Sequence, residues 1–292
     1  MKRELTVEEI KRQARIKLWI KRTGASIFLS VGAVAMVAPF LWMITTSLKE
    51  AGSLFSYDRP WWQDWIPTQF VWQNYAKAWK VVPFARFYLN SLFVSLCITA
   101  GQVLTSAMAA YAFARLHFPG RDKLFFGYLA TMMVPGAVTM IPVFILLRNL
   151  GWIDTYKAVI LPGIFTAYGT FLLRQFFLTL PKELEDAAKI DGCSYFGIFW
   201  RIILPLSKPA LATLTTFTFM GSWLNFMWPL IVLDTHNKFT LPVGLAYFQS
   251  LHTTDWTLLM AGSLMMILPI LIVFILNQRY FVEGIKLTGI KG

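Results

Sequence analysis

Two sets of uncharged polar residues recur at helical spacing inside long apolar stretches of the chain. Because residues three or four apart lie on one face of a helix, each set forms a stripe. The first stripe is Ser91, Ser95, Thr99, Gln102 and Ser106, and the second is Thr215, Thr218, Ser222 and Asn225. Such stripes either pack helices together through small hydroxyl residues or line a path for a neutral, hydroxylated solute. The candidates for path lining are Ser95, Thr99, Gln102, Thr218, Ser222 and Asn225, with helix packing as the alternative for each.

Side chains that commonly catalyse reactions or bind metals are scattered. His117, His236 and His252 fall in three different connecting segments, so their spacing does not predict a metal site. Cys97 lies in an apolar run and Cys193 in a polar loop, which indicates no disulfide framework. The centres of the apolar stretches hold essentially no charge, which argues against a proton relay, an ion-coupled pump or an intramembrane acid–base pair. We therefore expect no catalytic residue and no metal site.

The elements that carry the stripes are predicted to be membrane-spanning helices. The chain has 292 residues, of which 57% are hydrophobic and only 14% are charged, whereas a soluble domain carries roughly 25% charged residues. A helix of roughly 20 apolar residues crosses a bilayer and satisfies its own backbone hydrogen bonds in lipid. Six stretches qualify, at about 24–46, 87–113, 123–147, 157–178, 205–233 and 257–281. The sequence therefore predicts an all-α membrane protein with six transmembrane helices.

Prolines and glycines interrupt three of these stretches. Proline removes a backbone hydrogen bond and bends a helix, and broken helices often surround transport paths. The interrupting residues are Pro135, Gly136, Pro142, Pro162, Gly163, Gly169, Pro205, Pro209 and Pro229.

The distribution of positive charge predicts the orientation. Cytoplasmic connections are rich in Lys and Arg, and placing the N-terminus inside puts 19 of the 27 basic residues on that side. We therefore expect both termini in the cytoplasm. The expected organisation is a basic cytoplasmic segment at 1–23, a six-span domain at 24–282 and a cytoplasmic tail at 283–292. Although the net charge is +12, the basic residues form no continuous face, so no nucleic-acid partner is expected.

The connection between the fourth and fifth spans is predicted to form two short cytoplasmic helices, at 181–204. Pro181 and the acidic residues after it favour a helix start, Gly192 can end that helix in a left-handed conformation, and Ser194 can cap the next. The second helix is dense in aromatic residues. That apolar surface indicates either a protein partner or contact with the inner-leaflet interface.

This connection resembles the coupling motif of ABC importer permeases, E-A-A-x3-G-x9-I-x-L-P. The match departs at Asp186, where the family usually has Glu, and Glu185 stands just before it. The segment 223–230 and the ending Gly-Ile-Lys-Gly at 289–292 are similar to the carbohydrate branch of that family. Among its paired permeases, the chain resembles the smaller one, as in maltose-type importers. The residues that the resemblance assigns to coupling with an ATPase are Glu185, Asp186, Ala187, Ala188, Gly192, Ile202, Leu204 and Pro205.

The resemblance implies a type I ABC importer permease fold in a bacterial or archaeal cytoplasmic membrane. It implies a heterodimer with a second permease, two ATP-binding subunits, and a solute-binding lipoprotein or periplasmic protein outside. Gly289, Lys291 and Gly292 would reach between the ATP-binding subunits. The chain has no G-x-x-x-x-G-K-[ST] phosphate loop, so ATP and Mg²⁺ would be bound by the partner and this chain would be no enzyme and hold no cofactor.

Three functions are compatible with a polytopic membrane protein of this kind. The first is the permease subunit of an ATP-driven sugar or polyol importer, embedded in membrane lipid. The second is an ion-coupled secondary transporter that acts alone, and the absence of midplane carboxylates speaks against it. The third is a membrane enzyme or receptor, which should show a polar catalytic cluster within one leaflet, and the sequence shows none.

Overall fold

The computed structural model describes residues 7–52, 54, 60–248 and 254–289. Within these ranges the chain is helical and contains no β-strand, as expected for a membrane protein rich in long apolar runs. The residues form two compact units. One comprises Met1–Ala76 with Thr254–Leu264, and the other comprises Lys77–Thr253 with Met265–Gly292.

The first unit is dominated by helix α1, Val7–Ser47. It runs unbroken from the predicted basic segment into the first predicted span, and no residue in its most apolar 18-residue window is buried. At its C-terminal end, the Ser47 hydroxyl lies 2.8 Å from the hydroxyl of Tyr75. The Asn74 amide donates hydrogen bonds to the carbonyls of Ser47 and Lys49. These contacts hold the end of α1 against the start of α2, Gln73–Val81.

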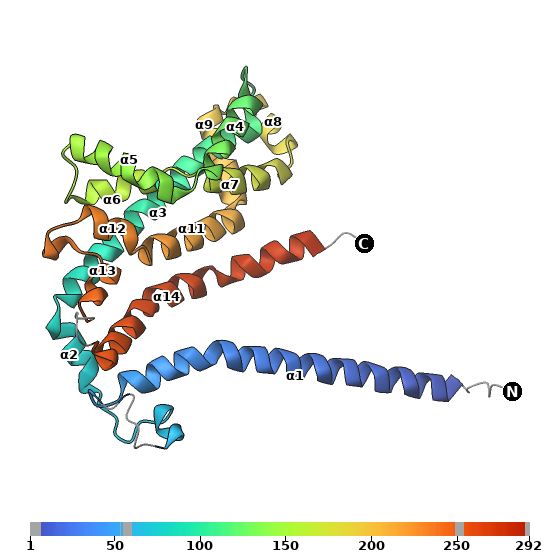
Figure 1. The fold of residues 1–292 in the computed structure, drawn as a ribbon. Helices are drawn as coiled ribbons and strands as arrows, with labels where there is room; N and C mark the ends of the chain where they lie inside the picture. Colours follow the sequence, from blue (N-terminus) through green and yellow to red (C-terminus); the bar gives the residue numbers. More distant parts are fainter. Residues whose placement is uncertain (1–6, 53, 55–59, 249–253, 290–292) are drawn as a thin grey trace. The chain divides into compact units, whose positions relative to one another are not determined.

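Helix α3, Phe84–Arg115, is the axis of the second unit. Helices α7 (Ala167–Thr179) and α11 (Lys208–Trp223) pack along it more extensively than any others, as Figure 1 shows. Glycine permits this close approach. A Cβ atom at Gly169 would lie 2.5 Å from the Ser106 hydroxyl oxygen, which is closer than real contacts allow.

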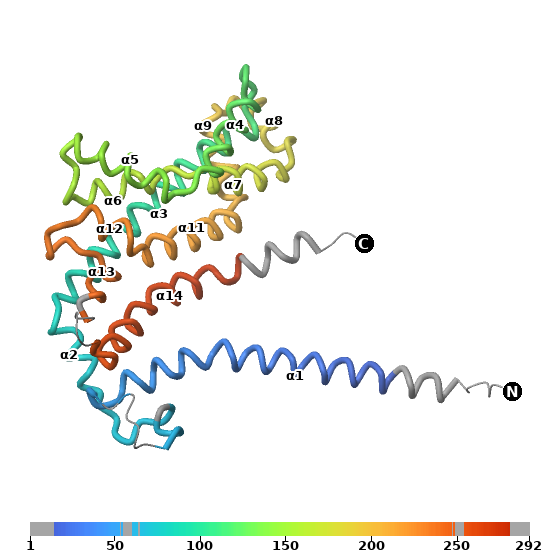
Figure 2. The backbone as a smooth tube through the Cα atoms, in the orientation of Figure 1, coloured from blue at the N-terminus to red at the C-terminus, as the bar shows by residue number. Residues whose placement is uncertain are grey.

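Two pairs of helices meet at sharp bends, which the backbone trace in Figure 2 follows. Helix α4 (Arg121–Ala130) continues as a 3₁₀ turn to Met133 and meets α5 (Gly136–Asn149) at 97°. Proline at position 135 has no N–H to continue the helix. The second pair meets at 80°, where the segment Tyr195–Leu206 gives way to α11. Among the residues that the structure describes, four helices are long and apolar enough to cross a membrane, or up to six if each bent pair is one span.

The predicted fourth and fifth spans are less continuous than expected. The fourth divides into α6, Tyr156–Gly163, and α7, with a break at 164–166. The fifth, predicted over 205–233, also divides, because α11 ends at Trp223 and a separate α12 covers Met227–Val232. The other elements are η1 Trp61–Asp64, α8 Glu183–Ile190, α9 Tyr195–Ile198, η3 Phe199–Ile203, α10 Leu204–Leu206, η4 His236–Lys238, α13 Leu241–Leu245, η5 Ala246–Phe248 and α14 Trp256–Gly289.

Candidate functional site: a polar pocket and a helical hairpin

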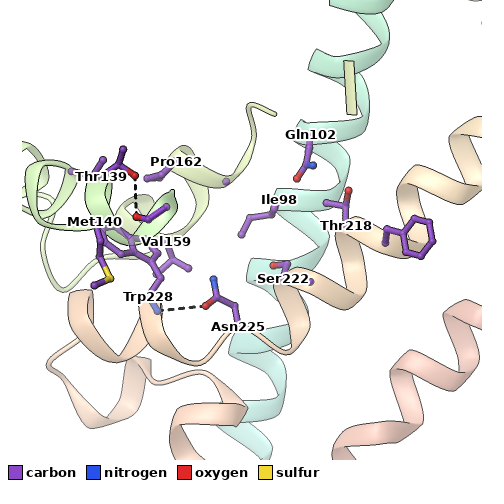
Figure 3. A pocket seen from close by; sticks show the side chains of 15 residues that line it. Ile98, Gln102, Thr139, Met140, Val159, Pro162, Thr218, Ser222, Asn225 and Trp228 are labelled. Carbon is purple, nitrogen blue, oxygen red and sulfur yellow. Dashed lines mark hydrogen bonds between the residues drawn. The ribbon is translucent and has the colours of Figure 1, made fainter. Parts of the chain in front are cut away.

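A pocket of about 510 Å³ lies within the second unit, where α3, α5, α6, α11 and α12 meet (Figure 3). Its lining combines apolar side chains with uncharged polar groups, and no lining residue carries a charge. The polar side chains that line it are Gln102, Thr139, Thr218, Ser222 and Asn225. Hydroxyl and amide groups both donate and accept hydrogen bonds, so the pocket suits a neutral ligand with many hydroxyl groups.

The helix breaks shape this pocket. Gly136 at the start of α5 and Pro162 and Gly163 at the end of α6 all line it, so two of the three lining residues at these ends have no side chain. Asn225 lies in the break between α11 and α12, and its Oδ1 atom accepts a 3.4 Å hydrogen bond from the backbone N–H of Trp228. The breaks therefore place both small residues and a polar side chain at the cavity.

The six candidates for path lining divide into two groups. Four of them line the pocket, namely Gln102, Thr218, Ser222 and Asn225. Ser95 and Thr99 do not, and both are buried where α3 packs. Thr99 faces a separate, mostly apolar pocket beside Leu211 and Thr215. The sequence did not single out Thr139, Met140 or Trp228, although Thr139 stands one helical turn beyond the Pro135–Gly136 break.

The predicted pair of short helices is present, and we call residues 181–206 the hairpin. Gly192 has φ +80°, the left-handed conformation expected at the end of the first helix. Ser194 caps the second, since its hydroxyl accepts a 3.2 Å hydrogen bond from the N–H of Gly197. The first helix starts at Glu183, two residues after Pro181. The second continues through a five-residue π-helix, Phe199–Ile203, to Leu206.

The aromatic helix of the hairpin is not a free surface along its whole length. Ile198, Phe199 and Ile203 are buried in a core cluster with side chains of α3, α7 and α11, including Tyr111 and Leu214. The opposite side remains exposed, with Tyr195, Phe196 and Trp200 each 45–63% exposed. One face of the hairpin is therefore part of the helix bundle and the other is open.

The residues assigned to coupling also divide by exposure. Asp186 and Ala187 are exposed, as are Gly192 and Pro205, whereas Glu185 and Ala188 are buried and Ile202 and Leu204 are half-buried. The Asp186 carboxylate lies 3.3 Å from the Lys189 ammonium. Asp186 thus presents a carboxylate on the open face, while Glu185 points inward. Of the tail residues, Gly289 is the last residue of α14, and Lys291 and Gly292 lie outside the described residues.

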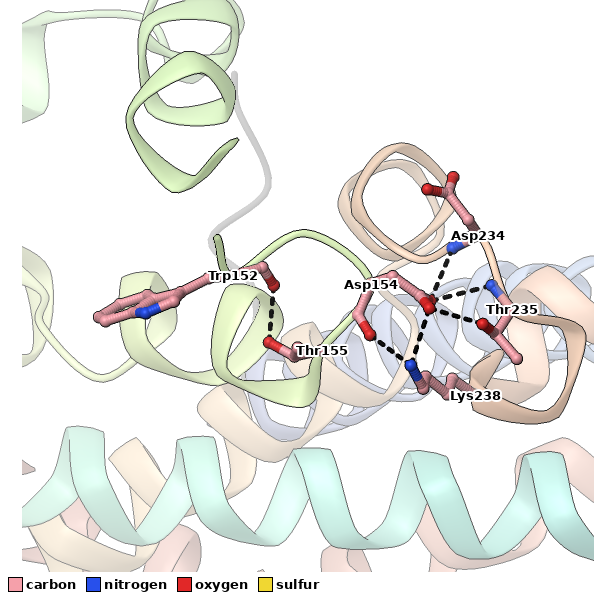
Figure 4. A network of polar contacts seen from close by, with 6 residues as sticks. All are labelled: Trp152, Asp154, Thr155, Asp234, Thr235 and Lys238. Carbon is pink, nitrogen blue, oxygen red and sulfur yellow. Dashed lines mark hydrogen bonds and ion pairs between the residues drawn. The ribbon is translucent and has the colours of Figure 1, made fainter. Parts of the chain in front are cut away.

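A polar network that the sequence did not predict surrounds Asp154 (Figure 4). Its carboxylate accepts hydrogen bonds from the backbone N–H groups of Asp234 and Thr235 and from the Thr235 hydroxyl, and lies 2.7 Å from the Lys238 ammonium. Burial acts to raise the pKa of Asp154, but these hydrogen bonds outweigh it and hold the pKa well below the usual range of a carboxyl group. The network joins the segment before α6 to the one after α12.

Comparisons with known proteins found transport-system components similar to this chain. A family model described as "Binding-protein-dependent transport system inner membrane component" matches residues 102–285. The arabinooligosaccharides transport system permease protein AraQ of Halalkalibacterium halodurans is 45% identical over 203 residues, covering 70% of this chain and 73% of that protein. The probable ABC transporter permease protein YurM of Bacillus subtilis is 35% identical over 288 residues, covering 97% and 93%.

Two further similarities concern transporters of negatively charged solutes. The sn-glycerol-3-phosphate transport system permease protein UgpE of Yersinia pestis is 36% identical over 228 residues, covering 75% of this chain and 81% of that protein. A chain in the crystal structure of a bacterial ABC transporter involved in the import of the acidic polysaccharide alginate matches with a TM-score of 0.80 and 24% identity, covering 90% of this chain and 96% of that one. The latter likeness shows a common fold.

Proposed function

Because this chain belongs to the family of binding-protein-dependent transport system inner membrane components, we propose that it is the permease subunit of an ABC importer for a neutral sugar or polyol. It is a membrane subunit and not itself an enzyme. The observation that carries the substrate class is the pocket at the helix breaks, whose polar lining groups are all uncharged. The membrane is the cytoplasmic membrane of a bacterium.

The uncharged lining separates this pocket from one suited to an anion. Glycerol 3-phosphate and acidic alginate, which the names of two similar transporters mention, both carry negative charge. Removing such an anion from water without a cationic partner is costly, and Arg or Lys normally supplies that partner. The pocket contains neither. A neutral oligosaccharide, as in the name of AraQ, fits its hydroxyl and amide groups better.

The exposed face of the hairpin is proposed to receive the ATP-binding subunit. Asp186 offers a negative charge there, and the small side chains of Ala187 and Gly192 permit close approach. The buried face packs against α3, α7 and α11. Closure of the ATP-binding subunits would therefore move the hairpin and these helices together, as a rigid body, and open the pocket to the opposite side of the membrane.

The proposed assembly follows from the same arrangement. The bent pair of α4 and α5 counts as one span and α11 with α12 as another. Together with the four long apolar helices this gives six spans, with both termini and the hairpin in the cytoplasm. A second permease and lipid would cover the apolar surface of α1, which is exposed in this single chain. Two ATP-binding subunits lie below, with the tail at 283–292 between them, and a solute-binding protein delivers the solute from outside.

Direct measurement of uptake tests the substrate class. The importer would be expressed in cells with its second permease, ATP-binding subunit and solute-binding protein. Uptake of labelled neutral pentose and hexose oligosaccharides and polyols would then be compared with uptake of glycerol 3-phosphate and uronate oligomers. We expect ATP-dependent uptake of at least one neutral solute and none of the anions. Uptake of the anions alone would contradict the proposal.

A further inference from the structure

Arg115, the last residue of α3, lies at a junction of three helices. Its side chain is only 2% exposed. Its Nη2 atom donates hydrogen bonds to the backbone carbonyls of Phe177 and of Leu180, the latter at 2.6 Å. These carbonyls stand at the C-terminal end of α7, where carbonyl groups lack helical partners and carry partial negative charge. The guanidinium therefore fastens the end of α3 to the end of α7.

The same guanidinium also faces the hairpin. Its Nε atom lies 3.0 Å from Oε1 of Glu185, in the first turn of α8, and the Glu185 side chain is 6% exposed. The contact is an ion pair without the alignment of a hydrogen bond. Tyr111 and Ala188 belong to the core cluster that packs at this junction. One buried side chain thus contacts the ends of α3 and α7 and the beginning of α8.

This arrangement gives α8 two different faces. The helix has only eight residues, and Glu185 and Ala188 are its buried members, so little apolar packing holds it in place. Asp186 and Ala187 lie on the exposed face. Separating two buried charges leaves both without compensation, which is strongly unfavourable. The ion pair therefore resists any sliding of α8 relative to α3 and α7 when force acts on the exposed face.

We propose that Arg115 is a positioning residue for energy coupling, which holds α8 to α3 and α7 through Glu185 so that movement of the ATP-binding subunit reaches the pocket helices. This inference rests on the proposed function. It assigns Glu185 a role inside the permease, distinct from that of the exposed Asp186 at the docking surface.

The test replaces the pair without leaving a buried charge. The double variant Arg115→Met with Glu185→Leu keeps similar volume, and such replacements commonly preserve folding. The complete importer would be reconstituted in liposomes, and the measurements would be the yield of assembled complex, ATP hydrolysis with and without loaded binding protein, and solute imported per ATP. We expect normal assembly, loss of stimulation by the binding protein, and about a three- to tenfold fall in solute imported per ATP.

Two further variants make the test specific. Arg115→Lys retains the positive charge and should retain coupling better than the double variant. The matched control is Arg121→Gln with Asp122→Asn, which removes an exposed pair with side chains 25% and 61% exposed, and it should couple normally. The inference is overturned if the assembled double-variant complexes import as much solute per ATP as the wild type, whatever the yield of assembly. An equal loss in the control would also overturn it.

Measurements on the wild-type complex separate the proposed permease function from the proposed role of Arg115. If the wild type imports solute with ATP and the double variant remains fully coupled, only the role of Arg115 fails. If the wild type shows no ATP-driven import, the proposed function fails and this inference falls with it.

Discussion

The hydroxyl oxygens of Ser95 and Ser222 lie 3.4 Å apart and join α3 to α11 across 127 positions of sequence. Ser95 is buried between the helices, whereas Ser222 lines the pocket. The contact thus marks the boundary between the two uses of the polar stripes.

Replacing Gln102 with Leu tests the pocket. The Gln102 side chain points into the cavity (Figure 3), and no hydrogen bond holds its amide among the described residues. Losing one hydrogen bond to a neutral solute costs about 0.5–1.5 kcal/mol, so we expect the KM for uptake to rise by roughly two- to tenfold. Initial uptake rates over a range of solute concentrations measure this change.

The same Gln102→Leu complexes provide the internal control. ATP hydrolysis in the absence of binding protein should remain at the wild-type rate, because Gln102 lies far from the hairpin in sequence and on no coupling surface. An unchanged KM together with altered basal hydrolysis would mean that Gln102 acts on coupling and not on the solute.

Gly192→Ala should impair coupling through backbone strain. A Cβ atom there would meet nothing within 4 Å, so space is not the constraint. At φ +80° the backbone of an L-residue is instead strained by about 1–2 kcal/mol. The turn between α8 and α9 would therefore relax to another shape. We expect reduced ATP-driven transport, with Gly192→Asn less affected because Asn tolerates this conformation. Gly127→Ala, in α4 with open space around it, is the matched control. Equal transport by Gly192→Ala and the wild type would refute the assignment of this turn.

Gly244→Ala should destabilise the second unit. Its added Cβ would lie 2.1 Å from Cδ2 of Phe87, whose ring is fully buried and packs edge-on against His236. Overpacking of this kind costs about 1–3 kcal/mol. Thermal unfolding in detergent, followed by tryptophan fluorescence, should show a lower Tm. Gly32→Ala, in open space on α1, should not shift it. Adding Phe87→Leu to Gly244→Ala should recover part of the loss, and no recovery would place the strain elsewhere.

The Asp154 network should confer stability that depends on pH. Because its pKa is lowered in the folded state, the ionised carboxylate stabilises the fold fully above the unfolded pKa of about 3.9, and this contribution is lost as the pH falls through the folded pKa. Asp154→Asn should therefore lower the free energy of unfolding by about 1 kcal/mol at pH 5–8. The gap between the two proteins should narrow below pH 4. Unfolding curves from pH 3 to 8 measure it, and a gap that widens on acidification would contradict the assignment.

Local signals in the sequence predicted much of this molecule. Long apolar runs predicted helices because lipid requires internal backbone hydrogen bonding. The left-handed turn at Gly192 and the cap at Ser194 followed from the chemistry of single residues, and both are confirmed. The stripes identified four of the pocket residues because helical spacing alone decides which side chains share a face.

What the sequence did not predict depends on tertiary contacts. Asp154 meets Lys238 across 84 positions, and Arg115 reaches Leu180 across 65. No local pattern indicates such pairs. Pro229 marked an interruption of the fifth stretch, but apolar composition continues across the break at 224–226, so hydropathy did not place the end of α11. Glu185 was assigned to coupling from its place beside the motif, and only the orientation of α8 shows that it points inward.

ATP dependence of import tests the central claim most directly. The chain would be reconstituted in liposomes with its second permease and ATP-binding subunit, with loaded solute-binding protein outside and ATP inside. The same chain would also be reconstituted alone under a proton or sodium gradient. The account predicts solute accumulation that requires ATP, the binding protein and all subunits, and none from the chain alone. Gradient-driven accumulation by the chain alone, with no effect of ATP, would contradict it.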